Sequence, residues 1–148
     1  MTLANMASWA KVKGIELLLT ADFTHPDWLS ELEENLVPTT DGDFALGRER
    51  FVLGTEISCV YKPACRARRV HRLLYAPTFE AVHSIRQIFE KLASKPNSDG
   101  CPQVGRELTA RLPDIDDACM VALAHIGTTM VWGVGIKIRI RFIRRTLR

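Results

Sequence analysis

An apolar run that ends abruptly in polar side chains constrains the fold of this chain more than any other stretch. Three leucines at 17–19 lead into Thr-Ala-Asp-Phe-Thr-His-Pro at 20–26. Short apolar runs bounded in this way predict buried strands. Sheets and barrels of the α/β class place their chemistry where strands end. We therefore expect Asp22 and His25 to lie at the mouth of such a sheet or barrel.

Similar strand-like runs carry an acid or a histidine at three later points. Glu56 and His125 each end such a run, and His71 lies within one. Imidazole and carboxylate ligands together suit zinc, manganese or iron. Clustered metal ions lower the pKa of a bound water and hold the attacking and leaving oxygens of a phosphodiester. We expect divalent metal to be bound where five side chains converge: Asp22, His25, Glu56, His71 and His125.

Each of these side chains also has an ordinary structural explanation. His25 could be a solvent-exposed loop histidine, and His71 could be a hydrogen-bonded histidine of the core. Glu56 could pair with Arg50 or Arg68, although a carboxylate at the end of a strongly apolar strand needs a partner or a metal. The residues alone leave these alternatives open.

Length, composition and charge restrict the class of protein. A chain of 148 residues can form one domain with a sizeable core. Its 47% hydrophobic and 25% charged residues are ordinary for a soluble globular protein. No apolar run is long enough to span a bilayer, and the N-terminus lacks the layout of a secretion signal, so we expect a cytoplasmic protein. The four cysteines form no C-x-x-C pair, which argues against a zinc ribbon or a thioredoxin-type site.

Periodicity and turn residues predict the element order α-β-α-β-β-β-α-α-β. Strands that alternate with helices favour a parallel or mixed sheet covered by helices. A closed β/α barrel takes about 250 residues, so any barrel formed here is partial. The sequence predicts helices over 2–13, 26–36, 78–93 and 106–112, strands over 15–20, 50–62 (as one strand or two), 68–75 and 119–124, and loops over 39–47 and 95–105.

Several phrases fall in an order that is typical of one protein family. They are Thr-Ala-Asp-Phe-Thr-His-Pro at 20–26, Thr-Glu-Ile-Ser-Cys at 55–59, Arg-Arg-Val-His at 68–71 and Ala-His-Ile at 124–126. This set resembles the PHP-domain phosphoesterases, and most closely their endonuclease Q branch. The resemblance implies a distorted β/α barrel with a cluster of zinc, manganese or magnesium ions. It also implies nicking of DNA on the 5′ side of deaminated bases, such as hypoxanthine and uracil, or of abasic sites.

Carried over position by position, the resemblance gives each candidate residue a role. Two ligand groups of the family, an N-terminal His-x-His pair and a later Asp-x-His phrase, have no counterpart in this sequence. We therefore expect residues 1–128 to form an incomplete PHP-like domain that is a weak nuclease, or an inactive one, when alone. A neighbouring polypeptide is a candidate source of the missing barrel strands. The family's metal-ligand phrases match Asp22, His25, Glu56, His71 and His125, and its phosphate contacts match Arg68 and Arg69.

The basic tail at 129–148 departs from the family. The family continues with Gly-Ser-Lys-Ser-Gly-Phe-Asp-Ser, whereas this chain has Ile-Lys-Ile-Arg-Ile-Arg-Phe-Ile at 136–143. Codons for the first string, read one base out of step, encode the second. Our hypothesis is that the tail from about Thr129 is an out-of-frame reading of a family gene. Alternatively, the tail alternates apolar and basic residues as a half-exposed strand does. Together with the arginines of 66–72 it could then form a non-catalytic nucleic-acid-binding module.

Overall fold

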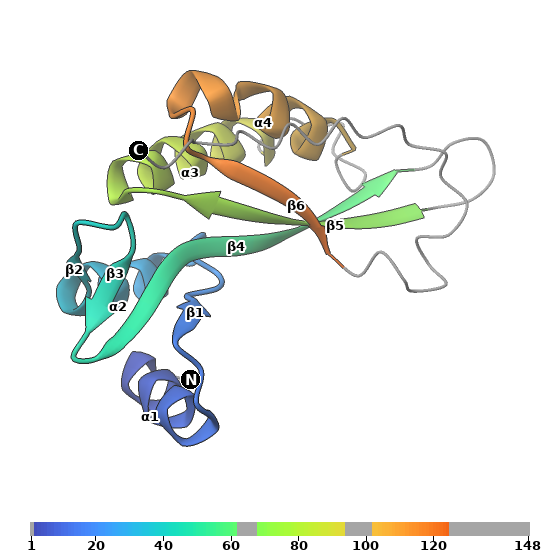
Figure 1. Ribbon diagram of the computed structural model, residues 1–148. Coiled ribbons are helices and arrows are strands. Elements are labelled where there is room, and N and C mark those ends of the chain that lie inside the picture. The colour runs from blue at the N-terminus through green and yellow to red at the C-terminus, as the bar shows by residue number, and fades with distance from the viewer. Residues whose placement is uncertain (1, 62–67, 94–101, 125–148) are drawn as a thin grey trace, which may run out of the picture.

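The structure is a computed structural model that describes residues 2–61, 68–93 and 102–124. Helices and strands alternate along the chain, and the strands form a twisted sheet, which gives an α/β fold (Figure 1). The elements are α1 (Leu3–Lys13), β1 (Leu17–Leu19), α2 (Pro26–Asn35), β2 (Val37–Pro38), β3 (Phe44–Leu46), β4 (Glu49–Tyr61), β5 (Arg68–Ala76), α3 (Phe79–Ala93), α4 (Pro102–Ile115) and β6 (Met120–Ala124).

The sheet is built around β4, its longest strand among the described residues. Its strand order is β2-β3-β4-β5-β6, and all these neighbours are antiparallel. Only β1 runs parallel to its partner, with Leu18 opposite Phe51 of β4. Helices α3 and α4 pack against each other and cover one face of the sheet (Figure 1).

The strand directions agree with the coarser part of the sequence prediction. We expected a parallel or mixed sheet from part of a barrel. The described sheet is mixed and mostly antiparallel, no closed barrel is present in the described part of the chain, and the partial barrel stays a prediction. The short connections explain why antiparallel pairs dominate. Only residues 62–67 separate β4 from β5, and a parallel crossover needs about a dozen residues or more.

Local signals in the sequence define the helix ends correctly. The Thr2 hydroxyl accepts a hydrogen bond from the Asn5 amide at 3.3 Å, and Gly14 ends α1 in the left-handed conformation with φ of 66°. The Thr78 hydroxyl accepts from the Ala81 amide at 3.1 Å at the start of α3. The predicted helices over 2–13, 26–36 and 78–93 are thus confirmed to within a residue or two. No helix within the described ranges has the length and apolar character that a membrane span requires.

Three local predictions were wrong. The 17–19 strand is not buried, since Leu17 is 53% exposed and β1 pairs with β4 alone among the described strands. The predicted loop over 39–47 contains β3, which is held by pairing with β4 rather than by its own sequence. Helix α4 begins at Pro102, within the predicted loop over 95–105, and continues through Pro113 to Ile115, although a proline beyond the first turn lacks the N–H of one helix hydrogen bond.

The core lies between the sheet and its covering helices. Phe51, Leu53 and Ile57 of β4 are buried, as are Val82 and Ile85 of α3. Side chains alternate between the two faces of a strand, so Glu56 lies on the face of β4 opposite this core and is exposed. The sheet therefore presents Glu56 outward while its neighbours hold the strand in place.

Candidate functional site

The loop after β1 is fastened to β4 by the first polar residue of the sequence motif. Thr20 is fully buried, and its amide donates to the Val52 carbonyl at 2.9 Å. Its hydroxyl accepts from the Gly54 amide at 3.1 Å. A buried hydroxyl needs such a partner, and this one continues the strand pairing by one residue. The loop that carries Asp22 and His25 therefore starts from a fixed point.

Three further hydrogen bonds hold this loop in a compact conformation. The indole N–H of Trp28 donates to the main-chain oxygens of Thr20 at 3.1 Å and Ala21 at 2.9 Å. The His25 amide donates to the Asp22 carbonyl at 2.9 Å. Ala21 and Asp22 have positive φ angles of 55° and 42°. Such a conformation costs a non-glycine residue about 1 kcal/mol or more and is concentrated at functional sites.

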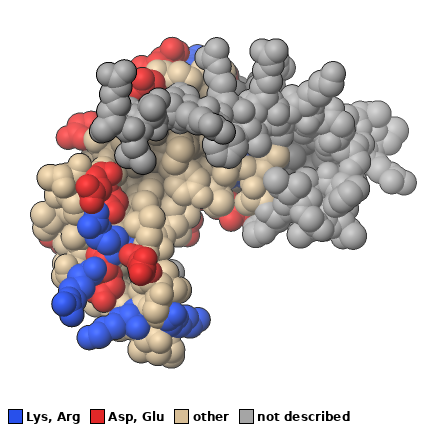
Figure 2. Space-filling model, in the orientation of Figure 1, with Lys and Arg blue, Asp and Glu red and all other residues tan. Residues whose placement is uncertain are grey.

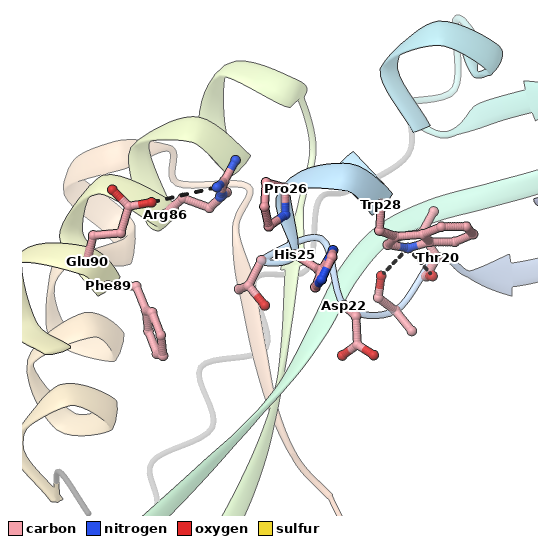
Figure 3. A pocket seen from close by; sticks show the side chains of 10 residues that line it. Thr20, Asp22, His25, Pro26, Trp28, Arg86, Phe89 and Glu90 are labelled. Atoms are coloured by element: carbon pink, nitrogen blue, oxygen red, sulfur yellow. Dashed lines mark hydrogen bonds and ion pairs between the residues drawn. The ribbon is translucent and has the colours of Figure 1, made fainter. Parts of the chain in front are cut away.

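A pocket of about 780 Å³ lies between this loop and helix α3. Asp22 and His25 lie on one side, and Arg86, Phe89 and Glu90 of α3 lie across from them (Figure 3). Its volume is in the range of small-molecule sites. The remaining lining residues are Thr20, Ala21, Thr24, Pro26 and Trp28.

A second carboxylate–imidazole pair lies on the exposed face of the sheet. His71 Nδ1 is 2.5 Å from Glu56 Oε1, and each side chain is about one-third exposed. The two residues are diagonal neighbours, because His71 lies opposite Ser58 in the register of β4 and β5. His71 also lies opposite Ala124 of β6, the residue before His125 in the sequence.

The structure thus brings the predicted site residues together in two pairs. Asp22 and His25 share the pocket, and Glu56 and His71 share a hydrogen bond. Within residues 2–61, 68–93 and 102–124, no three His, Cys, Asp or Glu side chains form a group that could hold a metal ion. His125 lies outside the described residues, and so do the side chains of Arg68 and Arg69 in β5. Convergence of all five candidate ligands stays a prediction.

The sequence reasoning missed the wall of the pocket on α3. It assigned Phe89 to the buried stripe of this helix and gave Arg86 no role. One signal was present, because Arg86 is four residues after Val82 and three before Phe89, and all three fall on one helical face. An arginine within an apolar stripe is a candidate for a paired or ligand-binding charge.

Comparison with known proteins shows which class of proteins shares this fold. No family model matches the sequence. Two solved structures of DNA endonucleases share the fold. One is the lesion-specific endonuclease PfuEndoQ from Pyrococcus furiosus, with a TM-score of 0.64 and 25% identity over 88% of this chain. The other is endonuclease Q in complex with a 27-mer duplex that has an abasic lesion at the active site, with a TM-score of 0.62 and 28% identity over 86% of this chain.

The particular fold is therefore endonuclease Q-like. The chain spans 31% of each of these solved structures. It is also 28% identical over 118 residues to the uncharacterised protein MJ0043 of Methanocaldococcus jannaschii. That alignment covers 78% of this chain and 13% of the relative. All three proteins are thus much longer than the segment they share with this chain.

Proposed function

We propose that this chain is part of a metal-dependent DNA repair endonuclease that cuts a phosphodiester at deaminated or abasic sites. One observation carries the proposal. The chain shares its fold, at 25–28% identity, with two endonuclease Q structures. In further support, its motif residues Asp22 and His25 line a pocket. The cytoplasmic location expected from the sequence belongs to the same proposal.

The donor set fits a divalent metal. Carboxylate and imidazole groups are the ligands that zinc and manganese take in proteins, and magnesium takes the carboxylates. We assign the ligand role to Asp22, His25, Glu56, His71 and His125, and phosphate contacts to Arg68 and Arg69. A bound metal supplies an activated water and neutralises charge on the phosphodiester.

Hydrogen bonds from neighbouring residues hold these candidate ligands in position. The hydrogen bonds of Trp28 fix the main chain that presents Asp22 and His25. The hydrogen bond between His71 Nδ1 and Glu56 Oε1 holds the imidazole ring in one orientation. Carboxylates commonly orient metal-binding histidines in this way. Glu56 can therefore act either as a ligand or as the group that positions His71.

The proposal includes a partial PHP-type barrel completed by neighbouring polypeptide. In support, β1 has one partner strand among the described strands. Large apolar side chains of α1 and β1 are also exposed, with Trp9 at 63%, Val12 at 75% and Leu17 at 53% exposure. Open strand edges and exposed apolar residues are features that a further strand would cover. With ligand groups of the family missing from the sequence, we expect the chain alone to be a weak nuclease or an inactive one.

The test combines metal content with nicking. After equilibration with zinc or manganese and gel filtration, the Asp22→Asn and Glu56→Gln variants should retain less metal than the unmodified chain. Asp117→Asn, an exposed acid outside both pairs, is the matched control. Equal metal retention by all three variants would contradict the ligand assignment. Nicking of inosine or abasic DNA should be weak and require manganese; rapid nicking by this chain, or nicking in a chelator, would contradict the proposal.

The alternative is a non-catalytic nucleic-acid-binding module that uses the basic residues. On the face drawn in Figure 2, Lys and Arg are interspersed with Asp and Glu over the lower part of the described surface. The tail and the side chains of most of the arginines on which this module depends lie outside the described residues. Such a module should bind DNA without metal and lose affinity steeply with salt. Metal-independent binding of undamaged duplex, with a steep salt slope, would favour the module over the endonuclease.

A further inference from the structure

Arg86 has an unusual environment for a charged side chain. It is 21% exposed and pairs with Glu90, four residues later on α3, at 3.6 Å. Its side chain makes no hydrogen bond to any side chain or main-chain group of the described residues. A guanidinium group has five N–H donors, and a largely buried one normally binds acceptors at shorter distances. Arg86 therefore has donors available for an anion that enters the pocket.

Arg86 supplies the positive charge of this pocket. It is the only Lys or Arg among the described residues that line the cavity. Its partner Glu90 is 68% exposed, so solvent screens much of their attraction. An incoming phosphate, with more oxygens and a shorter approach, can displace Glu90 at little cost.

Phe89 gives the same wall an aromatic surface. It extends from α3 into the space across from Asp22 (Figure 3). It is half-buried and packs against the hydrophobic core, which limits its movement. Every nucleobase has a flat face that can stack on such a ring. A cation and an aromatic ring next to each other on one helix are suited to the phosphate and the base of a nucleotide.

We propose that this pocket binds one nucleotide unit, with Arg86 holding its phosphate and Phe89 stacking on its base. This inference rests on the proposed function and names the contacts that the DNA would make at the site. The volume of about 780 Å³ accommodates a base and its sugar phosphate. The phosphate then lies between Arg86 and the loop of Asp22 and His25, where the proposed metal chemistry requires it.

Trp28 provides the measurement, because its indole lines the pocket. In a chain with Trp9→Phe and Trp132→Phe, titration with dUMP in EDTA at low salt should change the emission of Trp28. Deoxyuridine, which lacks the phosphate, should bind at least about tenfold more weakly, as expected for a lost charge-assisted hydrogen bond. Inorganic phosphate should compete with dUMP. Equal affinity for dUMP and deoxyuridine, or no binding of dUMP, would overturn the proposal.

Variants separate the roles of the two side chains. Arg86→Gln should remove the preference for dUMP over deoxyuridine, and Phe89→Leu should weaken both ligands several-fold. The matched control is Arg111→Gln, which breaks another i,i+4 pair, to Glu107 at 2.7 Å, outside the pocket lining. Thermal melts of each variant establish that it is folded. A loss of preference in Arg111→Gln equal to that in Arg86→Gln would refute the assignment.

The outcome is independent of the test of the proposed function, because it requires neither metal nor cleavage. Phosphate-dependent binding through Arg86 without metal retention at Asp22 would keep this inference and reject the endonuclease proposal. Metal-dependent nicking without an effect of Arg86→Gln on dUMP binding would do the reverse.

Discussion

Replacing Gly54 by alanine tests how closely β1 must approach β4. A Cβ at this position would lie 2.1 Å from Cδ1 of Leu19 and 3.1 Å from the carbonyl oxygen of Leu74. The Leu74 oxygen belongs to the paired strand β5 and cannot move away, so Leu19 must leave its place. Overpacking of this kind costs about 1–3 kcal/mol, and we expect about 2 kcal/mol for Gly54→Ala. The displacement also weakens the contact of Thr20 with the Gly54 amide.

Urea unfolding followed by far-UV circular dichroism measures this cost, with an unchanged m value as the sign of a true stability change. Leu19→Ala in the same chain removes the clashing atoms. The double variant should therefore be more stable than the sum of the single changes predicts, by about 1 kcal/mol. Ser58→Ala, an exposed change on the same face of β4, should alter stability by less than about 0.5 kcal/mol. A Gly54→Ala loss below that value, or strict additivity with Leu19→Ala, would refute the reasoning.

Three other predictions follow from described contacts. Trp28→Phe removes an indole donor bound to two main-chain oxygens and should cost about 1–2 kcal/mol in urea unfolding; no change would show that the loop holds itself. The Arg50 guanidinium lowers the pKa of Asp43, so this carboxylate adds stability above its unfolded pKa that is lost as the pH falls through its folded pKa. Asp43→Asn should lower the free energy of unfolding at neutral pH and make it fall less as the pH is lowered. Urea unfolding at a series of acidic pH values measures this, and an unchanged dependence of stability on pH would contradict it. Burial, helped by the charge of Asp116, raises the pKa of Cys119 to about 11. Its alkylation at pH 8, followed by peptide mass spectrometry, should be at least about tenfold slower in the folded chain than in urea; equal rates would contradict the burial.

The sequence predicted best what depends on neighbouring residues. Thr2, Gly14 and Pro26 define helix ends because caps and stops act within one turn of the chain. The strand β3 was missed because its residues at 44–46 become a strand only by pairing with β4. The prediction of a parallel or mixed sheet left the direction of each strand pair open, although the short link at 62–67 favours an antiparallel pair. Tertiary pairing of this kind overrides local pattern.

The candidate site shows the same difference between what neighbouring residues determine and what tertiary contacts determine. Asp22 and His25 could be proposed together because one short loop carries both residues. The contact of Glu56 with His71 was proposed only as part of a larger cluster, and it depends on the register of two strands. Arg86 could not be placed opposite Asp22 from the sequence, because that proximity requires α3 to lie across the pocket from the loop after β1. Side chains that meet across distant elements have no local signal.

The thirteen residues of β4 also determine how the molecule can come apart. Its first residues pair with β1 and β3, and the rest pair with β5, so one continuous strand belongs to both ends of the sheet (Figure 1). Neither end can melt while β4 stays whole, because loss of either set of partners exposes its backbone. Amide protons in the middle of this strand should therefore exchange last and only by global opening, and the described elements should unfold as a single cooperative unit rather than as two that unfold in turn.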